Sequence, residues 1–144
     1  MPPPPAVLAQ YQVVAARRQA FDTMMWQAPA LSLTAQSFLL SLAYGAQSTR
    51  LASAVAGVLS VIVSGMSVQL LLRHRQNEIT DSLLLHRIEL EQGWPEMFAS
   101  SKVRARTVSG PHRRLVRGRS YLIWACGLSI FGIAGLLAFV RAVL

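Results

Sequence analysis

The chain has 144 residues, a formal net charge of +8 and 53% apolar residues, and its single cysteine, Cys126, excludes an intrachain disulfide. Residues 23–49, 51–72 and 120–140 contain no Asp, Glu, Lys or Arg. Each stretch is long enough to cross a bilayer, because a spanning helix needs about 20 mostly apolar residues. The remaining residues are too few for a separate soluble domain with a sizeable core. We therefore expect an all-α integral membrane helical bundle with three transmembrane helices.

The N-terminal region, residues 1–28, is predicted to be a proline-capped amphipathic helix. Residues 1–5 include four consecutive prolines, which we expect to remain outside the helix, and no basic segment precedes an apolar run as in a signal peptide. Apolar residues then recur at helical spacing, with Arg18 on the same line. They are Val7, Tyr11, Val14, Phe21 and Met25. This face is expected either to lie on the membrane surface or to dock on the cytoplasmic part of the protein.

Residues 29–72 are predicted to form a transmembrane helical hairpin. Its first span, from Pro29 to Thr49, is the least apolar, and Pro29 suits the first turn of a helix. If this span is re-entrant instead of crossing, the N-terminus moves to the outside. The second span, Leu51–Leu72, is predicted to continue as a cytoplasmic helix until Gly93-Trp94-Pro95 ends it.

The third span is predicted from Tyr121 to Val140, within a last segment that comprises residues 120–144. Trp26 stands at the start of the first span, and Tyr121 and Trp124 stand at the start of the third. Aromatic residues are enriched at membrane–water interfaces, where their amphipathic rings sit at headgroup level. These positions agree with helices that cross the bilayer.

Small and hydroxyl-bearing residues form a stripe along each helix of the predicted hairpin. The first stripe is Thr34, Ser37, Ser41, Tyr44 and Ser48, and the second is Ser53, Gly57, Ser60, Ser64 and Ser67. An antiparallel hairpin pairs them in one constant register, 34/67 through 48/53, with the large Tyr44 opposite Gly57. Small residues let membrane helices approach closely. We interpret the stripes first as a helix–helix interface within the chain; a hydroxyl-lined pathway in an oligomer is the functional alternative.

The intervening segment, residues 73–119, holds ten of the fourteen Lys and Arg residues, which predicts a cytoplasmic location. The protein is then a multi-pass protein of the bacterial inner membrane with a cytoplasmic N-terminus and an extracytoplasmic C-terminus. The basic cluster is Lys102, Arg104, Arg106, Arg113, Arg114, Arg117 and Arg119. Basic juxtamembrane residues bind anionic lipids, and no aromatic residue is interleaved as a stacking platform for bases. Anionic lipid is therefore favoured over nucleic acid.

No catalytic or cofactor-binding motif is found. The chain has no Walker loop, no G-x-G-x-x-G and no nucleophile elbow, and its three histidines lack metal-ligand spacing. The acidic residues between Glu78 and Glu91 are interpreted as a solvated, mixed-charge helix face. We expect no enzymatic activity, no cofactor and no metal.

The stretch from Trp26 to Gln36, WQAPALSLTAQ, followed by the hairpin and Arg73-His74-Arg75, resembles small uncharacterised bacterial integral membrane proteins. The broader plan over residues 26–92 is similar to the SLATT class of membrane effectors linked to bacterial conflict systems, although a third span departs from that plan. The resemblance implies a homo-oligomer that permeabilises the membrane on a signal. The expected function is a pore-forming or membrane-perturbing effector. The alternative is a membrane anchor or adaptor that binds a cytoplasmic protein partner through residues 73–119.

Overall fold

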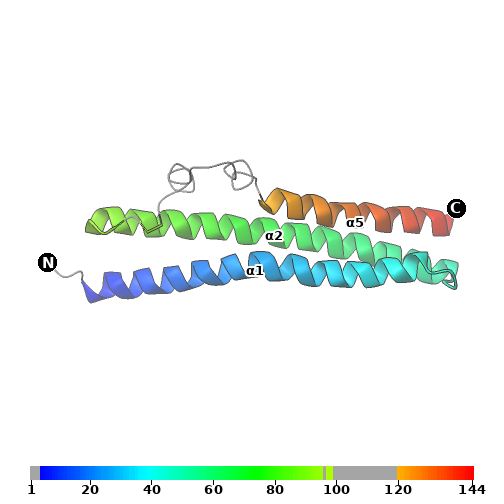
Figure 1. The fold of residues 1–144 in the computed structure, drawn as a ribbon, viewed down its shortest axis with the longest axis horizontal. Helices are drawn as coiled ribbons and strands as arrows, with labels where there is room; N and C mark the ends of the chain where they lie inside the picture. The colour runs from blue at the N-terminus through cyan, green and yellow to red at the C-terminus, as the bar shows by residue number, and fades with distance from the viewer. Residues whose placement is uncertain (1–3, 96, 99–119) are drawn as a thin grey trace, which may run out of the picture. The chain divides into compact units, whose positions relative to one another are not determined.

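A computed structural model of the protein describes residues 4–95, 97–98 and 120–144. Within these residues the protein is all-helical and contains no strand (Figure 1). The helices are α1 (Pro5–Tyr44), α2 (Arg50–Gln92) and α5 (Ser120–Val143). The predicted all-α class is confirmed. By length and composition, α2 and α5 are the two described helices long and apolar enough to cross a membrane.

Helix α1 differs from its prediction at both of its prolines. It begins at Pro5, whose fixed φ and missing N–H suit the first helical position. Pro29 was predicted to open a separate helix, but it lies inside α1. The prediction was wrong because a proline within a helix removes only one hydrogen bond, the one that its own N–H would donate to the carbonyl four residues earlier. For Pro29 that carbonyl belongs to Met25, and the hydrogen bonds of the neighbouring turns keep the helix continuous.

The ends of α2 follow from local hydrogen bonding. Thr49 caps its N-terminus, because the Thr49 Oγ1 accepts the Ala52 N–H at 3.2 Å. At the C-terminus Gly93 adopts a φ of 64°. The Trp94 N–H donates to the Glu89 carbonyl at 2.9 Å, and the Gly93 N–H donates to the Leu90 carbonyl at 3.3 Å. This is a Schellman ending, and it confirms that the helix continues from the second predicted span as far as Gln92.

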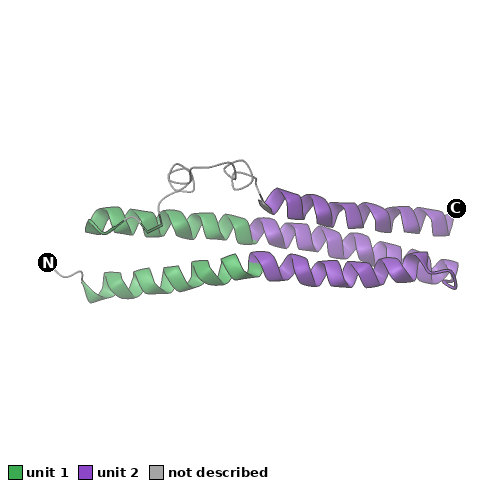
Figure 2. Cartoon of the chain, viewed as in Figure 1, with its two compact units in different colours: residues 1–24, 74–119 green, residues 25–73, 120–144 purple. Residues whose placement is uncertain are grey.

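The chain divides into two compact units (Figure 2). Unit 1 comprises residues 1–24 and 74–119, and unit 2 comprises residues 25–73 and 120–144. In unit 1, the first part of α1 pairs antiparallel with the last part of α2, as the Tyr11–Glu89 and Arg17–Asp81 contacts show. In unit 2, the second part of α1, the first part of α2 and α5 pack together. Residues 5–24 therefore dock on residues 74–92, which was one of the two predicted alternatives.

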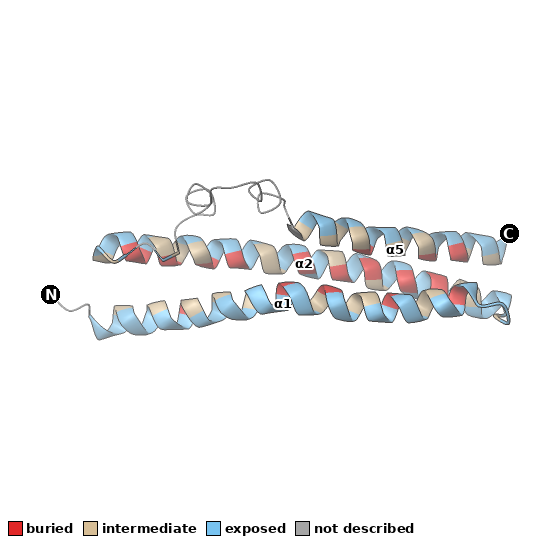
Figure 3. Ribbon diagram, viewed as in Figure 1, coloured by how far each residue is buried: buried red, intermediate tan, exposed pale blue. Residues whose placement is uncertain are grey.

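Buried residues recur along α2 at alternating spacings of three and four (Figure 3). In unit 2 the run is Gly57, Ser60, Ser64, Ser67 and Leu71, and in unit 1 it is Glu78, Asp81, Leu85 and Ile88; Ala56 and Glu89 are buried beside it. Such spacing keeps one stripe of a helix facing its neighbour, as in coiled-coil packing. The buried stripe of α2 consists mainly of small residues in unit 2, and of acids and apolar residues in unit 1.

Candidate functional sites

A buried glutamine connects the helices of unit 2. The Gln36 side chain is 0% exposed. Its Nε2 donates to the Ser60 carbonyl at 2.9 Å, and its Oε1 accepts the Ser60 hydroxyl at 2.5 Å. The same hydroxyl lies 3.3 Å from the Phe131 carbonyl of α5. Gln36 and Ser60 thus form one polar contact among α1, α2 and α5.

Glycine and serine residues bring the backbones of α2 and α5 close together. A Cβ added at Gly57 would lie 2.6 Å from the Gly135 carbonyl oxygen, and one at Gly132 would lie 2.6 Å from the Ser64 Oγ. The Ser64 hydroxyl donates to the Leu128 carbonyl at 2.5 Å. Small residues permit such a close approach between helices, and no larger side chain fits at Gly57.

The structure places the two predicted stripes in different environments. On α1, Thr34, Ser37 and Ser41 are exposed, and each hydroxyl donates to the carbonyl four residues earlier in its own helix. On α2, the stripe residues are buried, apart from the half-buried Ser53. The first stripe therefore lies outside the packed interior of unit 2 while the second lies within it.

The constant register predicted for the hairpin is correspondingly wrong for most pairs. Ser67 contacts Ser32 at 2.6 Å instead of Thr34, and Ser60 bonds Gln36 instead of Ser41. The Tyr44 hydroxyl donates to the Ala134 carbonyl of α5 at 2.8 Å, and the atoms nearest to a Cβ at Gly57 belong to Gly135 and Phe139 of α5.

Among the predicted pairs, Ser48 and Ser53 do meet, at 3.1 Å. The physical reason for the other changes is polarity. Isolated hydroxyls can bond to their own helix, whereas the larger amide of Gln36 needs partners from elsewhere, so α1 turns this residue inward.

Many large apolar side chains of unit 2 are exposed. Leu31 is 72% exposed, Phe38 65%, Met66 65% and Ile130 64%. Gln36, Ser60 and Ser64 lie inside instead. This distribution is the reverse of that in a soluble bundle, where large apolar side chains are buried and amides face water.

Unit 1 contains three buried acids that sequence reasoning assigned to a solvated face. Glu78 is 6% exposed, Asp81 3% and Glu89 0%. The Asp81 carboxylate accepts two hydrogen bonds from Arg17, Nε to Oδ2 at 2.8 Å and Nη2 to Oδ1 at 2.5 Å. Arg17 is half exposed, and this bond together with the Asp81 charge raises the pKa of its guanidinium further. The prediction of a solvated face was therefore wrong at these positions.

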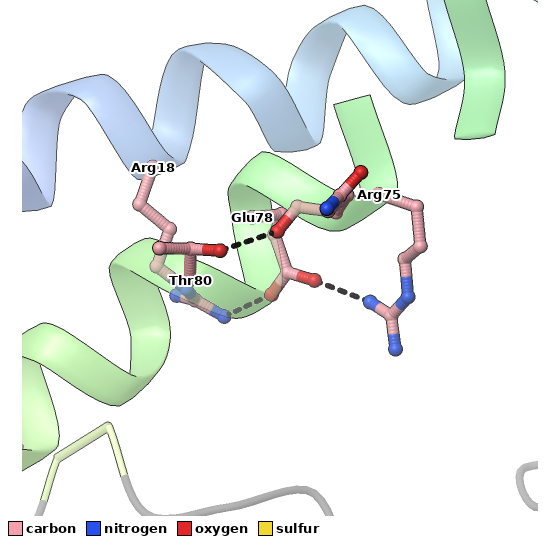
Figure 4. A network of polar contacts seen from close by, with 5 residues as sticks. Arg18, Arg75, Glu78 and Thr80 are labelled. Carbon is pink, nitrogen blue, oxygen red and sulfur yellow. Dashed lines mark hydrogen bonds and ion pairs between the residues drawn. The ribbon is translucent and has the colours of Figure 1, made fainter. Parts of the chain in front are cut away.

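The carboxylate of Glu78 lies between two arginines (Figure 4). The Arg18 Nη2 donates to its Oε1 at 2.9 Å, and the Arg75 Nη1 donates to its Oε2. The Arg18 guanidinium also lies over the Phe98 ring, 4.9 Å from its centre. Because Arg18 comes from α1 and Arg75 from α2, Glu78 joins both helices of unit 1.

Glu89 is held by a different set of donors. The Tyr11 hydroxyl donates to its Oε1 at 2.8 Å, and the Phe98 N–H donates to its Oε2 at 3.1 Å. The His86 Nδ1 lies 3.9 Å from the same carboxylate. Burial, and then the hydrogen bond and charge of Glu89, raise the pKa of Tyr11 to about 12. Tyr11 therefore remains a hydrogen-bond donor throughout the physiological pH range.

One sequence signal could have located these acids. Glu78 and Asp81 continue the spacing of three and four that begins at Gly57, so they fall on the same stripe as the buried serines. Because the residues change from hydroxyls to carboxylates along α2, we did not assign them to one stripe from the sequence. The complementary residues, Arg17 and Arg18, lie on the segment of α1 that docks there.

Within the described ranges, no group of three or more His, Cys, Asp or Glu residues is placed to hold a metal ion. The predicted lipid-binding cluster, Lys102 through Arg119, lies outside the residues that the structure describes. Comparison of the chain with protein-family models, with curated proteins and with solved structures finds no match.

Proposed function

We propose that the protein is a multi-pass protein of the bacterial inner membrane. Residues 25–73 and 120–144 cross the bilayer, and residues 1–24 and 74–119 are cytoplasmic. The inverted polarity of unit 2 supports this location, since large apolar side chains face outward and the amide of Gln36 faces inward. Trp26 and Trp124 also meet edge to face, 6.3 Å apart, at the starts of two predicted spans.

The proposal includes α1 as a third span, although its composition is less apolar than that of α2 and α5. Gln36, the most polar residue of its central part, is buried against Ser60 and would not contact lipid. The hydroxyls of Thr34, Ser37 and Ser41 bond to carbonyls of their own helix. Each of these four polar side chains therefore has a partner, as a helix in hydrocarbon requires.

We infer that the protein self-associates and acts as a membrane-perturbing effector, in agreement with its resemblance in plan to SLATT proteins. The observation that carries this proposal is the exposed stripe of Thr34, Ser37 and Ser41 on a unit whose surface is otherwise dominated by large apolar side chains. Small and hydroxyl-bearing faces favour contact between membrane helices. In a homo-oligomer this stripe would face other copies or line a shared pathway.

Leakage from liposomes tests the effector proposal. Purified protein reconstituted at increasing density is expected to release an entrapped dye, and Thr34, Ser37 and Ser41 replaced together by alanine should lower the release severalfold. Ser129→Ala is the matched control, because Ser129 is an exposed serine of α5 with the same bond to a carbonyl four residues earlier, at 2.8 Å. Absence of leakage at every density, or equal loss with the control, would reject the pathway.

The adaptor function remains the second candidate because of one surface of unit 1. Ile79 is 43% exposed, Leu83 59% and Leu90 58%, and their spacing places them on one side of α2. An exposed apolar stripe of this kind fits a helical partner protein. Leu83→Arg is then expected to abolish co-purification of a cytoplasmic partner without changing liposome leakage, whereas Arg87→Ala, at an exposed site nearby, should leave both unchanged.

A further inference from the structure

Residues 5–24 and residues 74–92, which pack together in unit 1, carry opposite net charges. Arg17 and Arg18 against Asp22 give residues 5–24 a net charge of +1, while Arg75 and Arg87 against four acids give residues 74–92 a net charge of −2. The four acids are Glu78, Asp81, Glu89 and Glu91. Among the residues of this unit that the structure describes, the buried apolar side chains are Val14, Leu85 and Ile88.

A contact of this composition is specific without being strongly stabilising. Desolvating buried charges offsets much of the attraction between them, so an ion-paired interface contributes less net stability than an apolar one of equal size. Two helices with so few buried apolar side chains also have little other stabilisation, because most helical stability in proteins comes from packing of an apolar face. The docked state of residues 5–24 is therefore open to competition.

Helix α1 also contains a weak point next to this segment. The boundary between the units falls between Met24 and Met25, and the Met25 carbonyl is the one that would bond the missing N–H of Pro29. Kinks in helices occur most often at proline. Met25 is therefore the position in α1 where a bend would break the fewest backbone hydrogen bonds.

The docked face of residues 5–24 also suits a bilayer surface. It presents Val7, Val14 and Phe21 together with Tyr11 and Arg18, an apolar face with a basic residue and an aromatic residue, as in interfacial amphipathic helices. A basic residue near an anionic membrane gains about 1 kcal/mol, equivalent to roughly a fivefold change in equilibrium. Because the same face serves both contacts, docking and lipid binding exclude one another.

From these observations we propose that residues 5–24 form a latch, hinged near Met25, that exchanges its acidic docking site on residues 74–92 for an anionic lipid surface. Release of the latch uncovers Glu78, Asp81 and Glu89, so that lipid composition sets how much of this acidic face is free. The inference rests on the membrane location proposed above. It adds a regulatory ligand, the anionic lipid headgroup, to that proposal.

Crosslinking in vesicles tests the latch. Phe21 and His74 are in ring contact at 5.7 Å, so Phe21→Cys with His74→Cys, in full-length protein carrying Cys126→Ala, reports docking through a short bismaleimide crosslinker. Crosslinking should be efficient in phosphatidylcholine vesicles. In vesicles rich in phosphatidylglycerol, the docked-to-undocked ratio should fall by up to about 30-fold, from two arginines at roughly fivefold each. High salt should restore docking, since exposed lipid contacts are screened more than buried ion pairs.

Two matched substitutions sharpen the result. Glu78→Gln removes a buried acceptor of Arg18 and should lower crosslinking at every lipid composition, whereas Glu91→Gln changes an exposed acid of the same helix and should not. Crosslinking that is equal in both vesicle types would overturn the latch. Flotation of the same vesicles after alkaline extraction separates the two proposals: protein that does not remain in the membrane rejects the location, and integrated protein with lipid-independent crosslinking rejects the latch alone.

Discussion

The two units use the same two helices in opposite ways. In unit 2 the buried stripe of α2 consists mainly of glycine and serine, and the surface around it is large and apolar. In unit 1 the same stripe carries Glu78 and Asp81, which pair with arginines. Spacing along α2 is unchanged between the units, so periodicity sets which face is buried. The residue types on that face, glycine and serine or paired carboxylates, determine how the helices are held together.

This difference has a physical origin in the surroundings we propose for each unit. In hydrocarbon, helices gain little from burying apolar side chains, so close backbone contact and neutral hydrogen bonds hold unit 2 together. Near water, charged residues can remain ionised, and a paired carboxylate orders two helices without requiring a large apolar core. Substitutions that disturb the close backbone contacts of unit 2 or the ion pairs of unit 1 should therefore lower stability.

The largest effect is expected where backbones touch in unit 2. Gly57→Ala places a Cβ 2.6 Å from the Gly135 carbonyl oxygen and 2.8 Å from the Phe139 nitrogen, both backbone atoms. Overpacking of this kind costs about 1–3 kcal/mol, measured by unfolding in mixed detergent micelles. Gly65→Ala is the control, because nothing lies within 4 Å of its added Cβ. Equal stability of the two variants would show that α2 and α5 do not pack in this way.

A comparable test in unit 1 removes a buried charge partner. Arg18→Met should destabilise docking of residues 5–24 by about 1–3 kcal/mol, because it removes a charged hydrogen bond to the buried Glu78. Arg17→Met should have a smaller effect, since the Arg17 side chain is 53% exposed. Hydrogen exchange of the amides in residues 5–24 measures both. A larger loss of protection in the Arg17 variant would contradict the contrast between the two arginines.

A smaller effect is expected from the neutral polar contact of unit 2. Gln36→Leu keeps most of the side-chain volume and removes the bonds to Ser60. Interhelical hydrogen bonds in membranes contribute about 0.6 kcal/mol on average, so the loss should be of that order in mixed-micelle unfolding. Thr34→Ala, at an exposed hydroxyl bonded within its own helix, should change stability even less. A larger loss of stability for Thr34→Ala than for Gln36→Leu would instead favour the constant hairpin register predicted from the sequence.

The hydrogen bond of Tyr11 to Glu89 should make stability depend on pH only in the alkaline range. The pKa of Tyr11 is raised to about 12 in the folded protein, above the value of about 10 for a free tyrosine. The folded state therefore holds this proton more tightly. Its contribution to stability is complete below pH 10 and is lost as the pH rises towards 12. Ultraviolet titration should show a late-ionising tyrosine signal that is lost in Tyr11→Phe. Ionisation of Tyr11 near pH 10 would mean that it does not contact Glu89.

Much of the fold follows from the sequence, because long uncharged stretches and strong stop signals are local features. The end of α2 at Gln92 is fixed by the Gly93 turn, and the inward face from Val7 to Phe21 is visible in its spacing. Pro29 within α1 could not be predicted in the same way, since a proline is compatible with both a helix start and a helix interior.

The candidate sites were predicted less completely than the fold. Hydroxyl spacing alone cannot distinguish a serine that bonds to its own helix, such as Ser37, from one that bonds across helices, such as Ser64. Likewise, the burial of Glu78 depends on Arg18, sixty residues away in the chain. Such pairings are set by tertiary contacts, which no local pattern records.

The central claim is that unit 2 crosses the bilayer, with α1 as one of the spans, and accessibility of the turn after α1 tests it most directly. Ala46→Cys, in a Cys126→Ala background, is exposed between Tyr44 and Arg50. A membrane-impermeant maleimide added to intact spheroplasts should label Ala46→Cys at once. It should label Glu91→Cys, at an exposed site of unit 1, only after lysis. Protection of Ala46→Cys until lysis would contradict the proposed crossing and orientation of α1 and α2.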